Sequence, residues 1–177
     1  MNLPNKLTTA RMALVPVLVL FMLTGWGGRA NTVICLVIFC AASVTDWFDG
    51  YLARKYDLVT NYGKFMDPLA DKLLVCSAMI CMISQGKLAA WIVVLIIGRE
   101  FIISGFRLIA AQNQVVIAAN MWGKAKTFCQ MIMIILLMAD IPALALVTKV
   151  SVILSVALTL ISLGTYIWEN KAVLHDE

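Results

Sequence analysis

Six long apolar stretches occupy most of this 177-residue chain. Each approaches the roughly 20 residues that a helix needs to cross about 30 Å of hydrocarbon. Hydrophobic residues make up 62% of the chain and charged residues only 14%, whereas about a quarter of an average soluble protein is charged. A water-soluble fold is therefore excluded, and we expect an all-α membrane protein. The stretches cover about residues 7–25, 31–53, 65–85, 88–110, 122–140 and 142–168.

Short segments rich in turn-forming residues separate these stretches, among them 25–31, 85–87 and 140–142. We therefore predict six transmembrane helices in one bundle, which form a single membrane-embedded domain over residues 1–177. Pro4 and the polar residues after it predict a short N-terminal interfacial segment before the first span. No small-residue cleavage site follows the first apolar stretch, so we expect that stretch to remain as a spanning helix.

Lysine and arginine are distributed unevenly between the two sides of such a bundle. With an internal N-terminus, nine lie on the inner side and three on the outer side. The positive-inside rule then predicts that both termini lie in the cytoplasm. The nine are Lys6, Arg11, Arg54, Lys55, Lys64, Arg107, Lys124, Lys126 and Lys171, and the three are Arg29, Lys87 and Lys149.

Five cysteines lie inside the apolar stretches and lack the spacing of a metal site. We interpret them as small hydrophobic residues rather than a disulfide framework, because their number is odd. They are Cys35, Cys40, Cys76, Cys81 and Cys129.

Four aspartates fall within the second and third apolar stretches. Asp46 and Asp49 are three residues apart and Asp67 and Asp71 four apart, so each pair lies on one face of its helix. Four unpaired acids at this depth would oppose membrane insertion by something on the order of 10 kcal/mol. Both pairs lie about 20 Å from the outer boundary by helix rise, just below the cytoplasmic interface. Because the two helices would be antiparallel neighbours joined by a short loop, the two pairs should face each other.

Four carboxylates at close quarters favour bound divalent cations, because like charges would otherwise raise one another's pKa values. Oxygen ligands select Mg²⁺ or Mn²⁺ over zinc. An acid near a helix end is often merely solvated, and we interpret Asp57 in that way. Small residues on the face of Asp46 and Asp49 leave room for a ligand, and nearby cations suit phosphate. The small residues are Gly50 and Ala53, and the cations are Arg54 and Lys64.

The pattern Asp46-x-x-Asp49-Gly50-x-x-Ala53-Arg54, followed by Gly63, Asp67 and Asp71, resembles the signature of the CDP-alcohol phosphotransferase family. The resemblance implies a six-helix membrane enzyme, usually a homodimer, in which a hydroxyl acceptor displaces CMP from a CDP-linked lipid or alcohol. It implies that the four aspartates hold two metal ions and that Asp71 is also the general base. It further implies nucleotide contacts from Asp46, Gly50, Ala53, Arg54, Thr60 and Lys64.

A second set of cations lies on the fourth and fifth stretches. Arg107, Lys124 and Lys126 are predicted to converge at the depth of the aspartates, where they would suit an acceptor that carries a phosphate. Arg99 lies halfway along the fourth stretch and requires a partner there. Adjacent helical residues diverge by about 100°, so we expect Glu100 to pair across helices rather than with Arg99.

Within that family, residues of about 2–130 are most similar to bacterial phosphatidylglycerophosphate synthases. The similarity rests on three runs, 5–11, 98–107 and 123–127. It implies CDP-diacylglycerol as donor, glycerol 3-phosphate as acceptor, a bacterial inner membrane and a cytoplasmic active site. It also implies an acceptor phosphate site formed by Arg107 and Lys124, with Asn5, Thr8, Arg11 and Lys126 nearby.

Other interpretations remain open. A relative that uses inositol phosphate or serine would carry the same aspartates, and the positive-inside bias alone would explain Lys6, Arg11 and Lys126. Intramembrane acids also occur in divalent-cation transporters, but the outer halves of the acidic helices, 32–44 and 73–84, are almost wholly apolar. Prenyl-diphosphate enzymes also use aspartate clusters, usually with closer spacing. No nucleic-acid partner is expected.

Overall fold

The computed structural model describes residues 3–55, 60–112 and 121–169, and within these ranges it leaves out some side chains, including those of 46–54 and 64. The described residues form helices and contain no strand. The helices are α1 (Leu3–Thr24), η1 (Gly28–Ala30), α2 (Asn31–Lys55), α3 (Asn61–Ser84), α4 (Ala90–Gln112), α5 (Met121–Ala139), η2 (Pro142–Leu144) and α6 (Ala145–Glu169). They belong to two compact units, Met1–Leu88 and Ala89–Glu177. The prediction of one domain stays a prediction.

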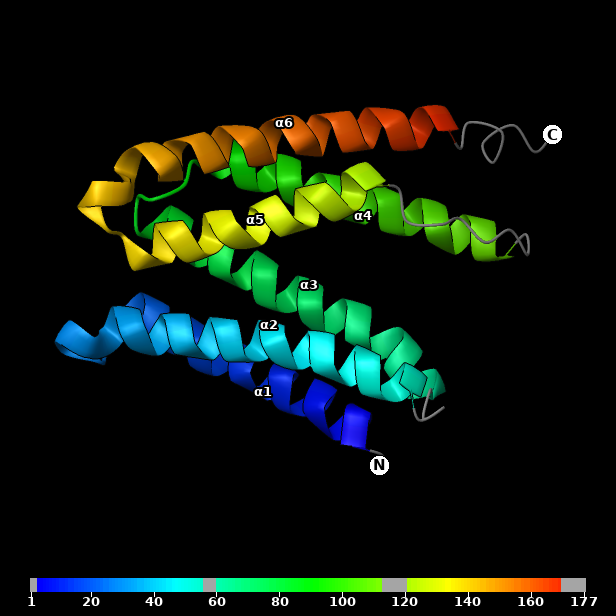
Figure 1. Cartoon of the computed structure of the whole chain (residues 1–177), viewed down its shortest axis with the longest axis horizontal. Coiled ribbons are helices and arrows are strands. Elements are labelled where there is room, and N and C mark those ends of the chain that lie inside the picture. Colours follow the sequence, from blue (N-terminus) through cyan, green and yellow to red (C-terminus); the bar gives the residue numbers. More distant parts are fainter. Residues whose placement is uncertain (1–2, 56–59, 113–120, 170–177) are drawn as a thin grey trace. The chain divides into compact units, whose positions relative to one another are not determined.

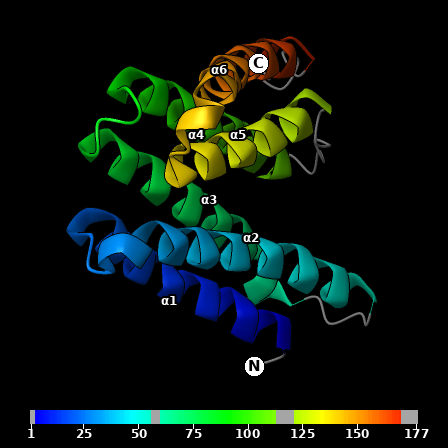
Figure 2. The same ribbon diagram turned by 60° about the vertical axis from the view of Figure 1, so that its left-hand side comes forward.

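In the first unit, α1 packs along both α2 and α3 (Figures 1 and 2). Most of its buried side chains are apolar, and Leu18, Phe39 and Leu74 have no exposed surface. Gly25 ends α1 with a φ of 63°, in the left-handed region that favours glycine. Gln85 Nε2 donates to the Met22 carbonyl oxygen at 2.7 Å and ties the end of α3 to α1. Helix α1 therefore packs against both of the other long helices of this unit.

In the second unit, α6 packs against α5 and, less extensively, against α4. Ile96, Met133 and Ile134 are fully buried in its interior. After α5 the chain turns at Asp140, whose φ of 49° is left-handed. Pro142 then begins the short helix η2, because proline needs no backbone N–H in a first helical turn.

Both units expose apolar side chains on their outer surfaces. Val37 is 61% exposed, Ile153 68% and Leu146 75%. Three stretches of the described residues are long and apolar enough to cross a membrane, and they are Asn5–Thr24, Met121–Ala139 and Pro142–Glu169. A membrane protein is therefore supported, since hydrocarbon would cover such surfaces.

The six predicted spans correspond to six long helices, and most boundaries agree within about two residues. Helices α3 and α4 carry too many charged residues to count as spans. In α3 these include Asp67, Asp71 and Lys72, and in α4 they are Arg99, Glu100 and Arg107. In α2 the described side chains form an apolar segment, Asn31–Thr45, that is too short to span by itself. The bundle of six spans therefore stays a prediction.

The expected interfacial segment before the first span is continuous with that span, and its place at the interface stays a prediction. Helix α1 begins at Leu3 and continues through Thr24 without interruption. Pro4 falls in its first turn, where the missing N–H removes no intrahelical hydrogen bond.

The interpretation of the cysteines is confirmed in one respect, since all five are free. Cys35 and Cys81 are buried, and Cys40, Cys76 and Cys129 are partly buried.

Candidate active site

The four aspartates of the signature lie on α2 and α3. Asp46 and Asp49 belong to α2, and Asp67 and Asp71 belong to α3, one helical turn apart and both half-buried. The side chains of Asp46 and Asp49 lie outside the described residues, so the facing of the two pairs stays a prediction. The same holds for four predicted nucleotide contacts, Gly50, Ala53, Arg54 and Lys64.

A short hydrogen bond joins α1 to the signature. Thr8 Oγ1 donates to Asp67 Oδ1 at 2.5 Å, and Thr8 has no exposed surface. Hydrogen bonds to an ionised carboxylate are shorter and roughly twice as strong as neutral ones. A residue predicted to lie near the acceptor phosphate therefore contacts a predicted metal ligand.

Thr60 caps the N-terminus of α3. Its backbone is extended and its Oγ1 accepts a hydrogen bond from the Gly63 N–H at 3.0 Å, which satisfies one of the first donors of the helix. The same hydroxyl donates to Asn5 Oδ1 on α1 at 2.9 Å. A predicted nucleotide contact and a predicted acceptor contact are thus bonded to each other. The preference of threonine for the cap position is a signal in the sequence, but the partnership with Asn5 has none.

Gly63 is buried, and three side-chain oxygens lie close to the position that its missing Cβ would occupy. A Cβ at this position would lie 3.3 Å from Asn5 Oδ1, 3.4 Å from Thr60 Oγ1 and 3.5 Å from Asp67 Oδ2. The first of these distances is too short for a relaxed contact, so a larger residue would push the oxygens apart. Glycine therefore preserves a close approach between the starts of α1 and α3.

The predicted metal site is only partly described. Among the side chains that the structure describes, no group of three or more His, Cys, Asp or Glu is placed to hold a metal ion. Two of the four predicted ligands, Asp46 and Asp49, lie outside that set. The three atoms nearest to a Cβ at Gly63 are oxygens, one of them Asp67 Oδ2, and oxygen is the donor that Mg²⁺ and Mn²⁺ prefer. Asp67 and Asp71 are the two predicted ligands whose side chains the structure describes, and by themselves they do not make up a metal site. Metal binding therefore stays a proposal.

Arg11 ties α1 to α2. Its side chain is only 1% exposed, and its Nε donates to the Ala42 carbonyl oxygen at 3.1 Å. Ala42 lies one helical turn before Asp46. Arg11 was predicted to lie near the acceptor phosphate, and the structure shows a role for its Nε in helix packing. Its contact with the acceptor stays a prediction.

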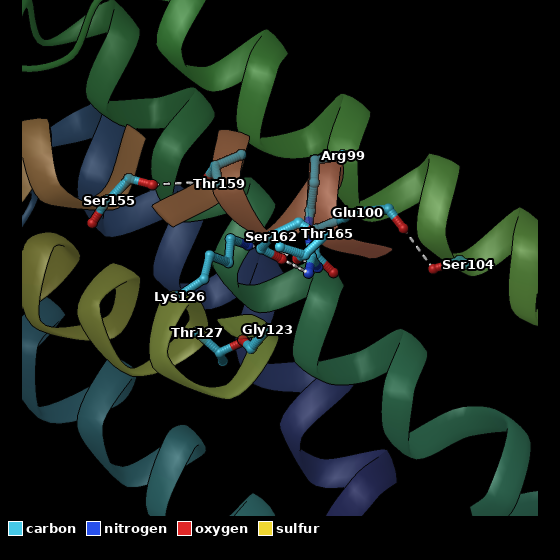
Figure 3. Close-up of polar contacts among 10 residues, drawn as sticks. All are labelled: Arg99, Glu100, Ser104, Gly123, Lys126, Thr127, Ser155, Thr159, Ser162 and Thr165. Carbon is cyan, nitrogen blue, oxygen red and sulfur yellow. Dashed lines mark hydrogen bonds and ion pairs between the residues drawn. The ribbon is translucent and has the colours of Figure 1, made fainter. Parts of the chain in front are cut away.

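The second unit buries a cluster of charged and hydroxyl groups. Glu100 Oε1 accepts from Arg99 Nη1 at 2.9 Å and from Lys126 Nζ at 2.6 Å. Arg99 Nη2 also donates to the Ser162 hydroxyl. Figure 3 shows these side chains reaching toward one another from α4, α5 and α6. We call Arg99, Glu100, Lys126 and Ser162 the Glu100 cluster.

The expected pairing of Glu100 is partly wrong. It pairs across helices with Lys126, as expected, but it also pairs with the adjacent Arg99. Both side chains are long, so they bend back and meet in spite of their divergence along the helix. Gly123 on α5 allows this arrangement, since a Cβ there would lie 3.2 Å from Arg99 Nη2.

The three predicted cations of the acceptor site differ in environment. Arg107 and Lys124 are exposed, whereas Lys126 is 1% exposed and bonded to Glu100. Their convergence on the aspartates stays a prediction. The sequence did not predict that Lys126 would pair with the carboxylate of Glu100.

Sequence reasoning missed the polar face of α6. Four of its residues, Ser151, Ser155, Thr159 and Ser162, are buried. Their spacing of three or four residues puts them on one helical face, so the pattern was available in the sequence. The buried Ser155 hydroxyl has no hydrogen-bond partner among the described residues.

Comparison with known proteins decides the family. The family described as CDP-alcohol phosphatidyltransferase matches residues 1–162, which include parts of both units. The chain belongs to this family. The resemblance predicted from the aspartate signature is therefore confirmed, and the chain is a transferase.

Several curated relatives are similar over most of the chain. The CDP-diacylglycerol-glycerol-3-phosphate 3-phosphatidyltransferase of Bacillus subtilis (strain 168) is 47% identical over 152 residues, which cover 80% of this chain and 79% of the relative. The protein of the same name from Rickettsia bellii (strain RML369-C) is 44% identical over 73% of this chain and 71% of the relative. A probable phosphatidylglycerophosphate synthase of Mycobacterium tuberculosis (strain ATCC 25618 / H37Rv) is 44% identical over 75% of this chain and 64% of the relative.

Proposed function

We propose that this enzyme transfers the phosphatidyl group of CDP-diacylglycerol to a hydroxyl of glycerol 3-phosphate, giving phosphatidylglycerophosphate and CMP. The observation that carries the proposal is the 47% identity to a transferase named for these two substrates. Side-chain oxygens of Asp67, Asn5 and Thr60 lie close together beside Gly63. They support the proposal, because oxygen atoms are the ligands that a hard cation such as Mg²⁺ prefers.

The four aspartates are proposed to hold two Mg²⁺ or Mn²⁺ ions. When bound, such cations neutralise the charge of a pyrophosphate and of the departing CMP. Asp67 contributes a carboxylate whose Oδ1 already accepts the Thr8 hydroxyl. Asp46 and Asp49 on α2 and Asp71 on α3 would complete the ligand set.

Asp71 is proposed as the general base. Its carboxylate would take the proton of the acceptor hydroxyl as the hydroxyl oxygen bonds to the phosphatidyl phosphorus. The bond from that phosphorus to the bridging pyrophosphate oxygen breaks, and CMP leaves with that oxygen. Positioning the hydroxyl in line with the leaving group accounts for much of the rate gain expected from such a site.

The donor and the acceptor are proposed to bind on different elements. The cytidine nucleotide would contact the signature segment through Asp46, Gly50, Ala53, Arg54, Thr60 and Lys64. The acceptor phosphate would contact Arg107 and Lys124, which the rest of the described chain leaves exposed and whose positive charges suit phosphate. The family resemblance implies that Asn5, Arg11 and Lys126 also lie near this phosphate.

The helices are proposed to span the membrane six times, as one domain with both termini and the active site on the cytoplasmic side. The excess of inner lysine and arginine supports this orientation. The bacterial relatives support an inner membrane as the location. A homodimer is proposed from the family resemblance alone.

The test is an assay with radiolabelled glycerol 3-phosphate and CDP-diacylglycerol in detergent micelles, with and without a chelator. We expect labelled lipid and CMP in equal amounts, loss of both with the chelator, and recovery on adding Mg²⁺ or Mn²⁺. CMP release that requires inositol phosphate or serine would replace the acceptor but keep the reaction. Metal-dependent ion flux in liposomes without CMP release would overturn the enzyme proposal.

A further inference from the structure

The hydroxyl of Thr8 has one hydrogen to donate, and its Oγ1 lies within hydrogen-bond distance of Asp67 Oδ1 as the donor. The donor and acceptor atoms are 2.5 Å apart. An ionised phosphate ester offers acceptor oxygens, so a threonine that binds it must donate its hydrogen to it. Thr8 cannot donate to a phosphate and to Asp67 at the same time. Its side chain is also 0% exposed, so a water-soluble acceptor does not reach it.

The hydrogen bond from Thr8 fixes one oxygen of the Asp67 carboxylate, and this also determines where the other oxygen points. Oδ1 is held by Thr8, whereas Oδ2 lies toward Gly63, 3.5 Å from the place of a Cβ there. Asn5 Oδ1 and Thr60 Oγ1 border the same place. Holding one oxygen by a hydrogen bond sets the plane of the carboxylate, so Oδ2 is presented in a reproducible direction.

The helix that carries Thr8 is anchored on both sides of it. One turn earlier, Asn5 accepts from Thr60 on the segment that starts α3. One turn later, Arg11 donates to the Ala42 carbonyl oxygen on α2. All three α1 residues are at most 7% exposed. Thr8 is therefore held in register with α2 and α3, which is the condition for it to orient a carboxylate precisely.

We infer that Thr8 is a positioning residue, which orients the Asp67 carboxylate for a divalent cation through its hydroxyl and does not contact the acceptor phosphate. This inference rests on the proposed function, in which Asp67 is a metal ligand. Carboxylates that bind metals are themselves held by hydrogen bonds from outer residues, and loss of such a partner typically costs about 10- to 100-fold in metal affinity or activity.

The test compares Thr8→Val, Thr8→Ser and a matched control, Thr9→Val, in the full-length detergent-purified enzyme. Valine keeps the shape of threonine and removes the hydroxyl, whereas serine keeps the hydroxyl. Thr9 lies next to Thr8, is exposed, and donates to the Asn5 carbonyl oxygen of its own helix. The readouts are Mn²⁺ affinity from the electron paramagnetic resonance signal of free Mn²⁺, and kcat and KM for each substrate.

We expect Thr8→Val to weaken Mn²⁺ binding by about 10- to 100-fold and to lower kcat, with the KM for glycerol 3-phosphate unchanged. Thr8→Ser should restore Mn²⁺ affinity, and Thr9→Val should match the wild type. If Thr8→Val does not accumulate, Thr8→Cys replaces it, because a thiol is a weaker donor of similar size and should give a smaller loss in the same direction.

Unchanged Mn²⁺ affinity in Thr8→Val would overturn the inference, and a raised KM for glycerol 3-phosphate in that variant would make Thr8 an acceptor contact. The Mn²⁺ measurement needs no substrate, so it separates the two proposals. A wild type that binds Mn²⁺ but does not use glycerol 3-phosphate would overturn the proposed acceptor and leave the role of Thr8 intact. A wild type that binds no Mn²⁺ would overturn the inference.

Discussion

The polar groups buried in the two units of this enzyme have different kinds of partner. In the first unit, the buried Thr8 hydroxyl holds one oxygen of Asp67, and the other oxygen lies toward Gly63, as do oxygens of Asn5 and Thr60. In the second unit, one oxygen of Glu100 receives both Arg99 and Lys126. Under the proposed function, the first arrangement orients a carboxylate toward a metal ion, whereas the second neutralises a carboxylate with two cations of its own chain.

This difference predicts how the units respond to substitution. A buried ion pair is costly to assemble, but removing one of its members strands an uncompensated charge. The Glu100 cluster links α4, α5 and α6, so its loss should lower stability first. The acids of the first unit are proposed to act on substrate, so their loss should lower activity first.

The largest expected effect comes from Asp71→Asn. A general base typically contributes about 10²- to 10⁴-fold, and the amide cannot accept the acceptor proton as a carboxylate does. CMP release should fall by that factor while the helical circular dichroism stays that of the wild type. An active Asp71→Asn enzyme would remove the proposed base.

The next effect is on stability, in Glu100→Gln. Two buried cations would lose their shared counter-charge, which should lower the free energy of unfolding by about 3–5 kcal/mol. Unfolding by denaturant in detergent, followed by circular dichroism, measures this. Asp140→Asn is the control, because Asp140 is exposed and asparagine tolerates its positive φ. Equal stability of Glu100→Gln and wild type would show that the cluster does not support the second unit.

Arg107→Ala tests whether a charged residue of the second unit binds substrate and does not act only in stability. Loss of a hydrogen bond between charged groups costs about 1.5–3 kcal/mol, or roughly 10- to 100-fold in binding. The KM for glycerol 3-phosphate should rise by that factor, and the KM for CDP-diacylglycerol should change little. The reverse pattern would assign Arg107 to the donor site.

The smallest effects distinguish two buried serines of α6. Ser162→Ala removes a partner of Arg99 and should cost about 1–3 kcal/mol of stability. Ser155→Ala should cost much less, because its hydroxyl has no hydrogen-bond partner among the described residues. Denaturant unfolding of both variants checks this, and equal losses would mean that the Arg99 contact contributes nothing beyond the volume of the side chain.

Much of the fold could be predicted from the sequence because membrane helices depend on long apolar runs. Predicted and observed helices share their order, and glycine or proline marks several of their ends. The early start of α1 was missed, since Pro4 looks like a helix breaker but is tolerated in a first turn. The aspartate signature likewise sufficed for the family, because its residues stand at fixed spacing.

The partners of the site residues were not predictable. Thr8 and Asp67 are 59 positions apart, and Asn5 and Thr60 are 55 apart. No local period encodes which residue of α1 meets which residue of α3. The double pairing of Glu100 depends on how two long side chains bend, and helical phase alone gave the wrong expectation for Arg99. Packing, rather than composition, decides these contacts.

The most direct test of the central claim is the number of Mn²⁺ ions that the purified enzyme binds. Acidic side chains on two adjacent helices should together bind two ions per chain, and Asp46→Asn and Asp67→Asn should each weaken this binding. Binding that is absent, or that neither substitution changes, would contradict the claim that these carboxylates form a shared metal site.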